Sequence, residues 1–235
     1  NPGDTTEPNP SLTPETPTAP PVNTAPESTN QIIKRVEGIN NMIALTFDDG
    51  PYPQMTAQYL AVLDKLNVQA TFFMIGQRIE YYPELARKVV QYGSEIGSHS
   101  WQHARLDQLT MDDIVQDLTL VENQVQINLG QEINLLRPPY GRYNDNVLAA
   151  AEQLGYKVIT WDVDPRDWEN HPPEKIVSGV LEQARPGSIV VMHEGQPNTL
   201  EALPVIIEKL REYGLEPVTV SEMLNQDPTQ MESEF

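Results

Sequence analysis

The segment Ala44-Leu45-Thr46-Phe47-Asp48-Asp49-Gly50-Pro51 joins an apolar run to two adjacent carboxylates and a Gly-Pro pair. The apolar run predicts a buried strand, and the Gly-Pro pair ends it. Neighbouring side chains of a strand point to opposite faces, so Asp48 and Asp49 have different roles unless the backbone turns there. A carboxylate at such a strand end must be ion-paired, hydrogen-bonded or metal-bound. The same residues are also typical of a plain turn, so both interpretations stay open at this point.

Composition limits the classes of protein to consider. The chain has 235 residues, of which 39% are hydrophobic, enough for one large domain or two small ones. Cysteine is absent, so disulfides and thiolate metal sites are excluded and a metal would need His, Asp or Glu. A formal charge of −19 argues against nucleic-acid binding and against docking on an anionic membrane. No apolar run is long enough for insertion into a membrane.

The first 31 residues differ in composition from the rest. They are rich in Pro, Thr, Asn and Glu, with Leu12 and Val22 as the only large aliphatic residues before residue 31. Such a segment cannot bury enough apolar surface to offset its ordering entropy. We expect residues 1–31 to be a disordered linker, residues 32–226 one folded domain, and residues 227–235 a flexible tail. The chain starts at Asn1 rather than Met, so the lack of a visible signal peptide says nothing about location.

From Ile32 onward, short apolar runs alternate with segments of helical spacing. The expected strands are Met42–Phe47, Ala70–Ile75, Glu95–His99, Ile133–Arg137, Lys157–Asp164, Ser188–His193 and Glu216–Val220. The expected helices are Met55–Leu66, Pro83–Tyr92, Met111–Leu129, Asn144–Leu154, Pro173–Ala184 and Leu200–Tyr213. This order predicts an α/β fold with a parallel sheet covered by helices. We expect an irregular (β/α) barrel of about seven parallel strands, with an open doubly wound sheet as the alternative.

Several residues mark where these helices begin and end. Thr110 precedes Met111 and two acidic residues, which is typical of a helix N-cap. Four glycines follow expected helix ends, where a left-handed residue is common: Gly93, Gly130, Gly155 and Gly214.

Residues that could take part in catalysis or metal binding fall at the carboxyl ends of the expected strands. They are Asp48-Asp49, His99 with His103, Arg137–Tyr140, Asp164–Trp168 and His193. In a β/α architecture those ends converge on one face, which is where active sites lie. This convergence favours an active site over a plain turn at Asp48-Asp49.

Three of these residues suit a metal ion. Asp49, His99 and His103 offer one carboxylate and two imidazoles, a set typical of Zn²⁺ or a similar divalent ion. The two histidines are four residues apart and share a face if a helical turn follows the strand. A pair with this spacing is also common on protein surfaces. The remaining histidine, His171, is expected in a loop without a role.

Five ordered motifs carry a family resemblance. They are Thr46–Gly50, His99–His103, Arg137–Gly141, Asp164–Trp168 and Val191–His193. Together they resemble the motifs of the polysaccharide deacetylases, the NodB-homology domain of carbohydrate esterase family 4. The resemblance covers about Val36 to Leu224 and implies the deformed TIM-like barrel of that family. Residues 32–226 would then be a catalytic domain.

The resemblance implies a role for each residue in these motifs. Asp48 would be the general base, and Asp49, His99 and His103 would hold the metal. His193 would be the general acid. A carboxylate beside such a histidine raises its pKa and keeps it charged.

The same resemblance implies supporting residues. Arg137 would hold the general base, Asp167 would orient the acidic histidine, and the backbone N–H of Tyr140 would stabilise the oxyanion. The pocket for the acetyl group would be lined by Trp168, Val191 and Pro138, with Val191 standing where the family usually has Leu.

The implied function is a metal-dependent hydrolase that removes N-acetyl groups from N-acetylglucosamine in peptidoglycan. The implied cofactor is one divalent ion, Zn²⁺, with Co²⁺ or another divalent ion as alternatives. A chitin or chitooligosaccharide deacetylase or an acetylxylan esterase would use the same residues, and an inactive carbohydrate-binding relative is the alternative outside enzymes. We expect an extracellular monomer, secreted or tethered to the cell surface through residues 1–31, with an acetylated polysaccharide as its partner.

Some residues also have purely structural interpretations. Trp161 is expected to be a core aromatic, and Trp168 could be one too. Arg137 could form a plain salt bridge, and Asp164 is expected only to cap a turn before Pro165. The acidic residues of the helix over 111–129 are expected to be solvated surface: Asp112, Asp113, Asp117 and Glu122.

Overall fold

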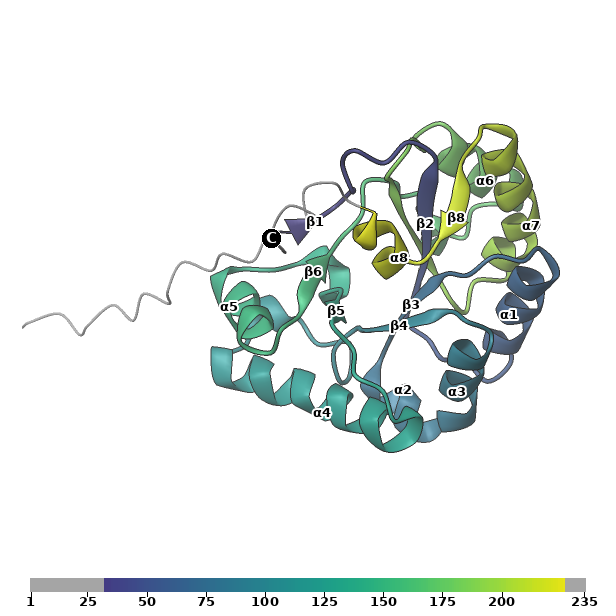
Figure 1. Cartoon of the computed structure of the whole chain (residues 1–235). Helices are drawn as coiled ribbons and strands as arrows, with labels where there is room; N and C mark the ends of the chain where they lie inside the picture. Colours follow the sequence, from purple (N-terminus) through teal and green to yellow (C-terminus); the bar gives the residue numbers. More distant parts are fainter. Residues whose placement is uncertain (1–31, 227–235) are drawn as a thin grey trace, which may run out of the picture.

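The computed structural model describes residues 32–226, which form a sheet surrounded by helices (Figure 1). The predicted linker over 1–31 and tail over 227–235 lie outside the described residues. The strands are β1 (Ile32–Ile33), β2 (Met42–Asp48), β3 (Thr71–Met74), β4 (Glu95–Ser98), β5 (Leu135–Leu136), β6 (Lys157–Ile159), β7 (Ile189–His193) and β8 (Glu216–Val218).

The strands follow the order β1-β6-β5-β4-β3-β2-β7, and β8 pairs with β2. Every ladder between these strands is parallel. After β6 ends, Val163 forms a parallel bridge with Val190 of β7. This bridge brings the β6 end of the strand order next to the β7 end. The predicted irregular (β/α) barrel with about seven parallel strands is therefore confirmed, and the short β1 is an additional strand.

Two predicted strands are much shorter than expected. The strand predicted over Ile133–Arg137 is only β5 (Leu135–Leu136), and the strand predicted over Lys157–Asp164 ends with β6 at Ile159. The backbone N–H groups of Asp162 and Val163 both donate to the carbonyl of Ile189, at 3.2 and 3.3 Å. Two consecutive residues facing one partner interrupt a regular ladder, as in a β-bulge.

Most of the helices cover the outside of the strands (Figure 1), whereas the last one packs in a separate cluster with Ala44 and Phe73. The α-helices are α1 (Thr56–Lys65), α2 (Gly76–Tyr81), α3 (Pro83–Gln91), α4 (Met111–Leu129), α5 (Asp145–Gln153), α6 (Pro173–Leu181), α7 (Pro197–Glu212) and α8 (Val220–Asn225). The 3₁₀ turns are Leu106–Gln108, Pro139–Gly141 and Asp167–Glu169. The six predicted helices are confirmed within a few residues, whereas α2 and α8 were not predicted. None of the helices in residues 32–226 is both long and apolar enough to cross a bilayer.

The predicted helix ends are also confirmed. The hydroxyl of Thr110 accepts a hydrogen bond from the backbone N–H of Asp113 at the start of α4. The four glycines expected after helix ends all have positive φ, between 64° and 78°: Gly93, Gly130, Gly155 and Gly214. These local signals depend on few residues, which is why sequence alone identifies them.

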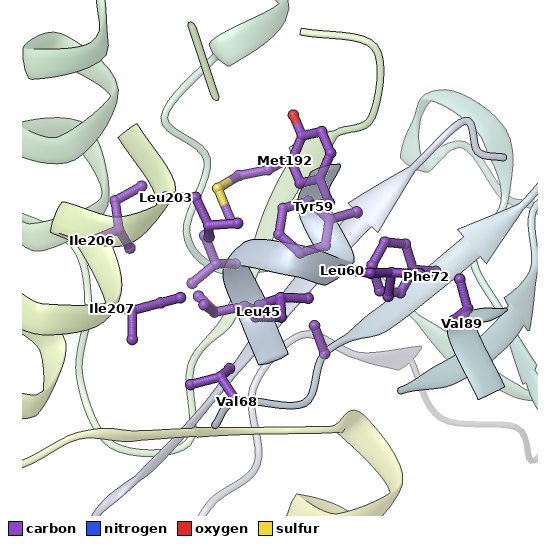
Figure 2. Close-up of a cluster of buried hydrophobic side chains, with 14 of the residues drawn as sticks. Leu45, Tyr59, Leu60, Val68, Phe72, Val89, Met192, Leu203, Ile206 and Ile207 are labelled. Atoms are coloured by element: carbon purple, nitrogen blue, oxygen red, sulfur yellow. The ribbon is translucent and has the colours of Figure 1, made fainter. Parts of the chain in front are cut away.

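The largest hydrophobic core lies between the barrel wall and the helices α1, α3, α6 and α7 (Figure 2). Leu45 of β2 and Phe72 of β3 pack there against Tyr59 and Leu60 of α1. Burying one such aliphatic side chain stabilises the fold by about 1.5–3 kcal/mol. The core thereby holds β2 beside its neighbours and sets where the strand ends lie.

Candidate active site

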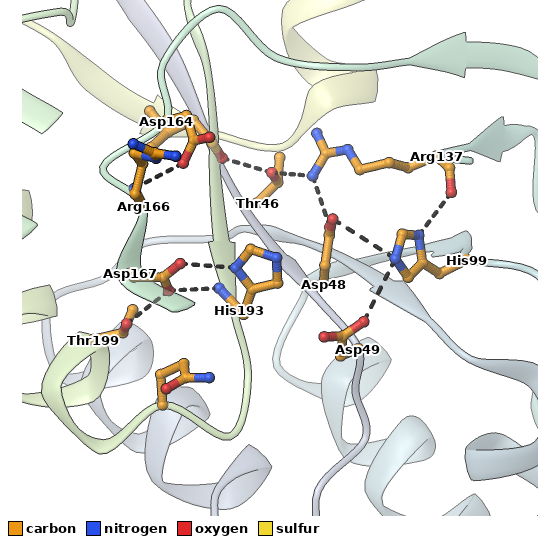
Figure 3. A network of polar contacts seen from close by, with 12 residues as sticks. Thr46, Asp48, Asp49, His99, Arg137, Asp164, Arg166, Asp167, His193 and Thr199 are labelled. Carbon is orange, nitrogen blue, oxygen red and sulfur yellow. Dashed lines mark hydrogen bonds and ion pairs between the residues drawn. The ribbon is translucent and has the colours of Figure 1, made fainter. Parts of the chain in front are cut away.

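The site lies at the carboxyl ends of β2, β4 and β7. Asp48 is the last residue of β2 and pairs in register with His193, the last residue of β7. Asp49 follows with φ 75°, a left-handed backbone that turns the chain between the two carboxylates. The turn and the active site are therefore the same feature. It sends Asp48 towards Arg137 and Asp49 towards His99 (Figure 3).

Asp49, His99 and His103 come together as a possible metal site. Asp49 Oδ1 lies 3.5 Å from His99 Nε2 and 3.3 Å from His103 Nε2. All three ligand atoms lie within 4.8 Å of one another. Asp49 Oδ1 is buried without a hydrogen-bond partner, which is the situation of a ligand atom that faces a cation.

The hydrogen bonding of His99 also fits a metal ligand. Its Nδ1 lies 2.7 Å from the carbonyl oxygen of Arg137, which can only accept. Nδ1 therefore carries the proton, and the lone pair of Nε2 faces Asp49, the arrangement usual in metal-bound histidines. The donor set thus fits a divalent cation.

The loop between the two histidines is not the helical turn that the sequence suggested. Ser100 and His103 have φ values of 64° and 61°, so left-handed residues bring the second imidazole back towards the first. The first amides of α2 hold this loop: Gly76 N–H donates to Ser100 O at 3.0 Å and Gln77 N–H to Trp101 O at 2.9 Å. The unpredicted α2 is therefore part of what positions the site.

Asp117 also holds the histidine loop, contrary to the prediction of a solvated surface residue. It is only 9% exposed, and its Oδ1 accepts a 2.8 Å hydrogen bond from Trp101 N–H. Burial raises the pKa of Asp117 to about 6. Its spacing of three residues after Ile114 and four before Val121 places it on the buried stripe of α4, a signal the sequence did contain. Of the other acidic residues on α4, Asp112 and Asp113 are exposed as predicted and Glu122 is partly buried.

Asp48 forms a buried ion pair with Arg137. Arg137 Nη1 donates to Asp48 Oδ1 at 2.8 Å and to Thr46 Oγ1 at 2.6 Å, and Nη2 donates to Thr160 O at 3.0 Å. Burial alone would raise the pKa of Asp48, but the charges of Arg137, His99 and His193 outweigh it, so that the pKa is lowered. Asp48 is therefore held as a carboxylate in the barrel wall.

His193 is held by Asp167 through two hydrogen bonds. His193 Nδ1 lies 2.8 Å from Asp167 Oδ1, and the His193 backbone N–H donates to Asp167 Oδ2 at 2.8 Å. Thr199 Oγ1 donates to the same Oδ2 at 2.7 Å, which fixes the carboxylate (Figure 3). Burial alone lowers the pKa of His193, but the hydrogen bond to Asp167 and the charge of Asp48 raise it to about 9.

The remaining predicted site residues lie at the same face. Tyr140 has φ 62° and is exposed, and its ring packs edge-on against His103 with 4.6 Å between centroids. Trp168 is 51% exposed, which excludes the core alternative for it. Pro138 and Val191 are buried, the latter to 1% exposure. The pocket roles of these residues stay predictions.

Three residues that were not assigned to the site have other contacts. Asp164 Oδ1 accepts a 2.8 Å hydrogen bond from Arg166 N–H, which is the expected turn. Trp161 is partly buried and packs against a hydrophobic cluster of the barrel, as predicted. His171 pairs with Glu169 at 3.1 Å in a loop.

Glu194 is a buried residue that the sequence analysis missed. Thr56 Oγ1 donates to Glu194 Oε1 at 2.6 Å, and Glu194 Oε2 lies so close to Gly50 that a Cβ there would stand 1.6 Å away. Burial raises the pKa of Glu194 to about 8. A side chain at position 50 would therefore displace the Glu194 carboxyl group from its present position. Only its position next to His193 distinguishes Glu194 in the sequence.

The polysaccharide deacetylase family matches residues 35–159, which include both carboxylates of β2, both histidines of the metal cluster and Arg137. The chain is also 38% identical over 207 residues to the peptidoglycan-N-acetylglucosamine deacetylase of Bacillus cereus, covering 84% of this chain and 95% of that protein. The chain belongs to the polysaccharide deacetylase family.

Two further relatives place this polysaccharide deacetylase within its family. It is 37% identical to the peptidoglycan-N-acetylmuramic acid deacetylase PdaC of Bacillus subtilis, over 80% of this chain and 40% of that longer protein. Its fold matches the crystal structure of BA3943 from Bacillus anthracis, described as a family 4 pseudoenzyme, with a TM-score of 0.80 and 29% identity. That match covers 83% of this chain and 69% of that one. The family thus contains both active and inactive members.

Proposed function

We propose that this polysaccharide deacetylase is a metal-dependent hydrolase that removes N-acetyl groups from N-acetylglucosamine units of peptidoglycan. The observation that carries the proposal is one face on which a ligand cluster, a buried carboxylate and a protonated histidine lie together. The names of the relatives support amide hydrolysis of a cell-wall glycan. An inactive relative is the less favoured alternative, because both buried ion pairs and the ligand cluster are complete.

Asp49, His99 and His103 would hold the cation, for which we propose Zn²⁺ because one carboxylate and two imidazoles suit it. When bound, such an ion acts as a Lewis acid that lowers the pKa of water and polarises a carbonyl group. The rest of the reaction needs groups that move protons and hold the substrate.

Asp48 is the proposed general base. Its Oδ1 already accepts from Arg137, so Oδ2, which lies 3.9 Å from His99 Nε2, is the oxygen left to take a proton. Arg137 keeps this carboxylate ionised and prevents it from turning away. An acid and a base in such positions typically contribute about 10²–10⁴-fold each to the rate.

His193 is the proposed general acid for the leaving amine. Asp167 holds Nδ1, so the proton to be donated is the one on Nε2. The raised pKa keeps that proton in place at neutral pH. Tyr140 would donate its backbone N–H to the oxyanion, and Trp168, Val191 and Pro138 would surround the acetyl methyl group.

The proposed substrate places the protein outside the cell, at the cell wall, as its relatives' names suggest. Secretion, or tethering through residues 1–31, is the finer form of this proposal, and we propose that the domain acts as a monomer.

Acetate release tests the proposed function directly. Purified protein loaded with Zn²⁺ should release acetate from peptidoglycan, with N-acetylated chitooligosaccharides and acetylated xylan assayed in parallel. The Asp48→Asn variant serves as the matched inactive control. Faster release from chitooligosaccharides would favour a chitooligosaccharide deacetylase, and faster release from xylan would favour an esterase. No release from any of the three would support the inactive alternative.

A further inference from the structure

Beside the ligand cluster lies an arginine that none of the proposed catalytic roles uses. Arg78 belongs to α2, and its guanidinium lies 3.9 Å from the ring centroid of Tyr52. Tyr52 stands three residues after Asp49, in the loop that follows β2. Because α2 begins on the carbonyls of Ser100 and Trp101, it adjoins the histidine loop, and Arg78 stacks on a loop that starts at the proposed metal ligand Asp49.

The ring of Tyr52, on which Arg78 stacks, is also held in place by its other neighbours. A Cβ placed on Gly195 would lie 2.7 Å from Tyr52 Cζ, so the ring packs directly on the backbone that follows β7. Tyr52 N–H donates to Thr56 Oγ1 at 2.8 Å, which ties the same loop to α1. Arg78 therefore rests on a rigid support, and little side-chain entropy is lost when it binds a ligand.

Two other arginines near predicted site residues provide a comparison. Arg105 lies 6.0 Å from the ring centroid of Tyr140 and is paired with Asp107 at 2.7 Å. Arg166 lies 5.5 Å from the ring centroid of Trp168 and is paired with Glu169 at 2.9 Å. Both of these charges are thus neutralised by an adjacent carboxylate.

Arg78 differs from both in this respect. Within residues 32–226, no carboxylate oxygen lies within 4.0 Å of its guanidinium nitrogens. The nearby Glu194 carboxyl hydrogen-bonds to Thr56, and the charge of Arg78 acts on it only at longer range. A half-buried guanidinium that stacks on Tyr52 and has no carboxylate in salt-bridge contact is well suited to bind a carboxylate through two parallel hydrogen bonds. In a protein of charge −19, such a local cation is needed for an anionic glycan to approach.

We propose that Arg78, supported by Tyr52, forms a subsite for a carboxylate carried by the sugar next to the reacting N-acetylglucosamine unit. The inference rests on the proposed function and specifies its substrate as an acidic glycan. In peptidoglycan the carboxylate is either the free lactyl group of muramic acid or a carboxylate of the attached peptide. Neutral chitooligosaccharides have neither group.

The test compares three substrates: N-acetylated chitooligosaccharides, peptidoglycan strands stripped of peptide, and strands with peptide attached. The variants are Arg78→Gln and Arg78→Lys, with Lys88→Gln on the exposed side of α3 as the control for a change of one charge. We expect Arg78→Gln to lower kcat/KM on an acidic strand about tenfold, mainly through KM, as for a lost charge-assisted hydrogen bond. Arg78→Lys should recover part of this loss, and turnover of the chitooligosaccharide should stay within about twofold of wild type for all variants.

The substrate on which Arg78→Gln loses kcat/KM identifies the carboxylate that Arg78 binds. A loss confined to stripped strands assigns the lactyl carboxylate, and a loss confined to peptide-bearing strands assigns the peptide. Equal losses on the neutral oligomer, or no loss on any substrate, would overturn the subsite while leaving the proposed function intact. Wild-type protein inactive on all three would instead overturn the proposed function, and the subsite with it.

Salt dependence gives a second test. As the ionic strength rises, the difference in KM for acidic strands between wild type and Arg78→Gln should shrink, because salt screens the contact of Arg78, whereas the repulsion from the net charge of −19 is screened in both proteins. A difference in KM that does not change with salt would contradict the proposal.

Discussion

The carboxylate of Asp117 in α4 accepts a 2.8 Å hydrogen bond from the backbone N–H of Trp101, midway between His99 and His103. A helix on the outside of the barrel thus holds the loop that carries two of the three proposed metal ligands. The bond does not require a charged acceptor, since the amide oxygen of Asn could accept it equally well.

We therefore predict that Asp117→Ala weakens metal binding and stability, whereas Asp117→Asn does neither. Loss of the acceptor should cost about 1–3 kcal/mol in unfolding free energy, because the N–H of Trp101 loses its partner. Zinc affinity should fall about tenfold, which is the lower end of the roughly 10–100-fold loss typical when a residue that supports a metal ligand is removed. Urea unfolding and zinc titration measure the two effects. Zinc affinity of Asp117→Ala equal to wild type would show that the loop holds its shape without α4.

Asp48 and Asp49 are neighbours but should respond differently to substitution. Asp49→Asn removes a charged ligand, so zinc affinity should fall and excess zinc should restore part of the activity. Asp48→Asn leaves the ligand cluster in place, so zinc should still bind, while turnover falls about 10²–10⁴-fold and added zinc does not help. The measurements are zinc stoichiometry and acetate release with and without added zinc. Metal loss in Asp48→Asn but not in Asp49→Asn would reverse the two roles.

The pH dependence of the reaction should report on His193. Its raised pKa of about 9 means that the proton on Nε2 is present at neutral pH and is lost as the pH rises through that value. Activity should therefore fall on the alkaline side near pH 9. In Asp167→Asn the negative charge that raises this pKa is gone, so the alkaline limb should move to lower pH.

Asp164→Asn is the comparison for this experiment, because Asp164 lies in the same loop and closes a turn, and it interacts with His193 by charge alone, without a hydrogen bond. Its alkaline limb should move less than that of Asp167→Asn. An alkaline limb that is unchanged in Asp167→Asn would mean that another group supplies the proton.

The pair of Arg137 and Asp48 should matter for stability as well as for activity. Arg137→Met leaves the carboxylate of Asp48 buried without its counter-ion, which should cost about 3–5 kcal/mol in unfolding free energy. Adding Asp48→Asn to that variant should recover much of the loss, because the uncompensated charge is then removed. Chemical denaturation of the two single variants and the double variant measures the coupling. Additive losses would indicate that Arg137 acts mainly through its contacts with Thr46 and the carbonyl of Thr160.

Sequence reasoning failed at residues whose partners are distant along the chain. Asp117 was expected in solvent, although its spacing from Ile114 and Val121 already placed it on the buried stripe. Glu194 is marked in the sequence only by its position next to His193, and Arg78 is not marked by any pattern. The first contacts Thr56 and Gly50, and the second lies on Tyr52, and no local pattern relates these pairs.

The alternation of strands and helices follows from the amino-acid sequence, because apolar periodicity and capping residues such as Thr110 act over a few positions. Asp49, His99 and His103 can also be grouped from the sequence, since residues at the ends of parallel strands share a face. The closure of the barrel through the bridge of Val163 with Val190, and the contacts that hold the ligand loop, are visible in the folded structure alone. Those outcomes depend on contacts between distant segments, whose geometry arises only when the helices pack on the sheet.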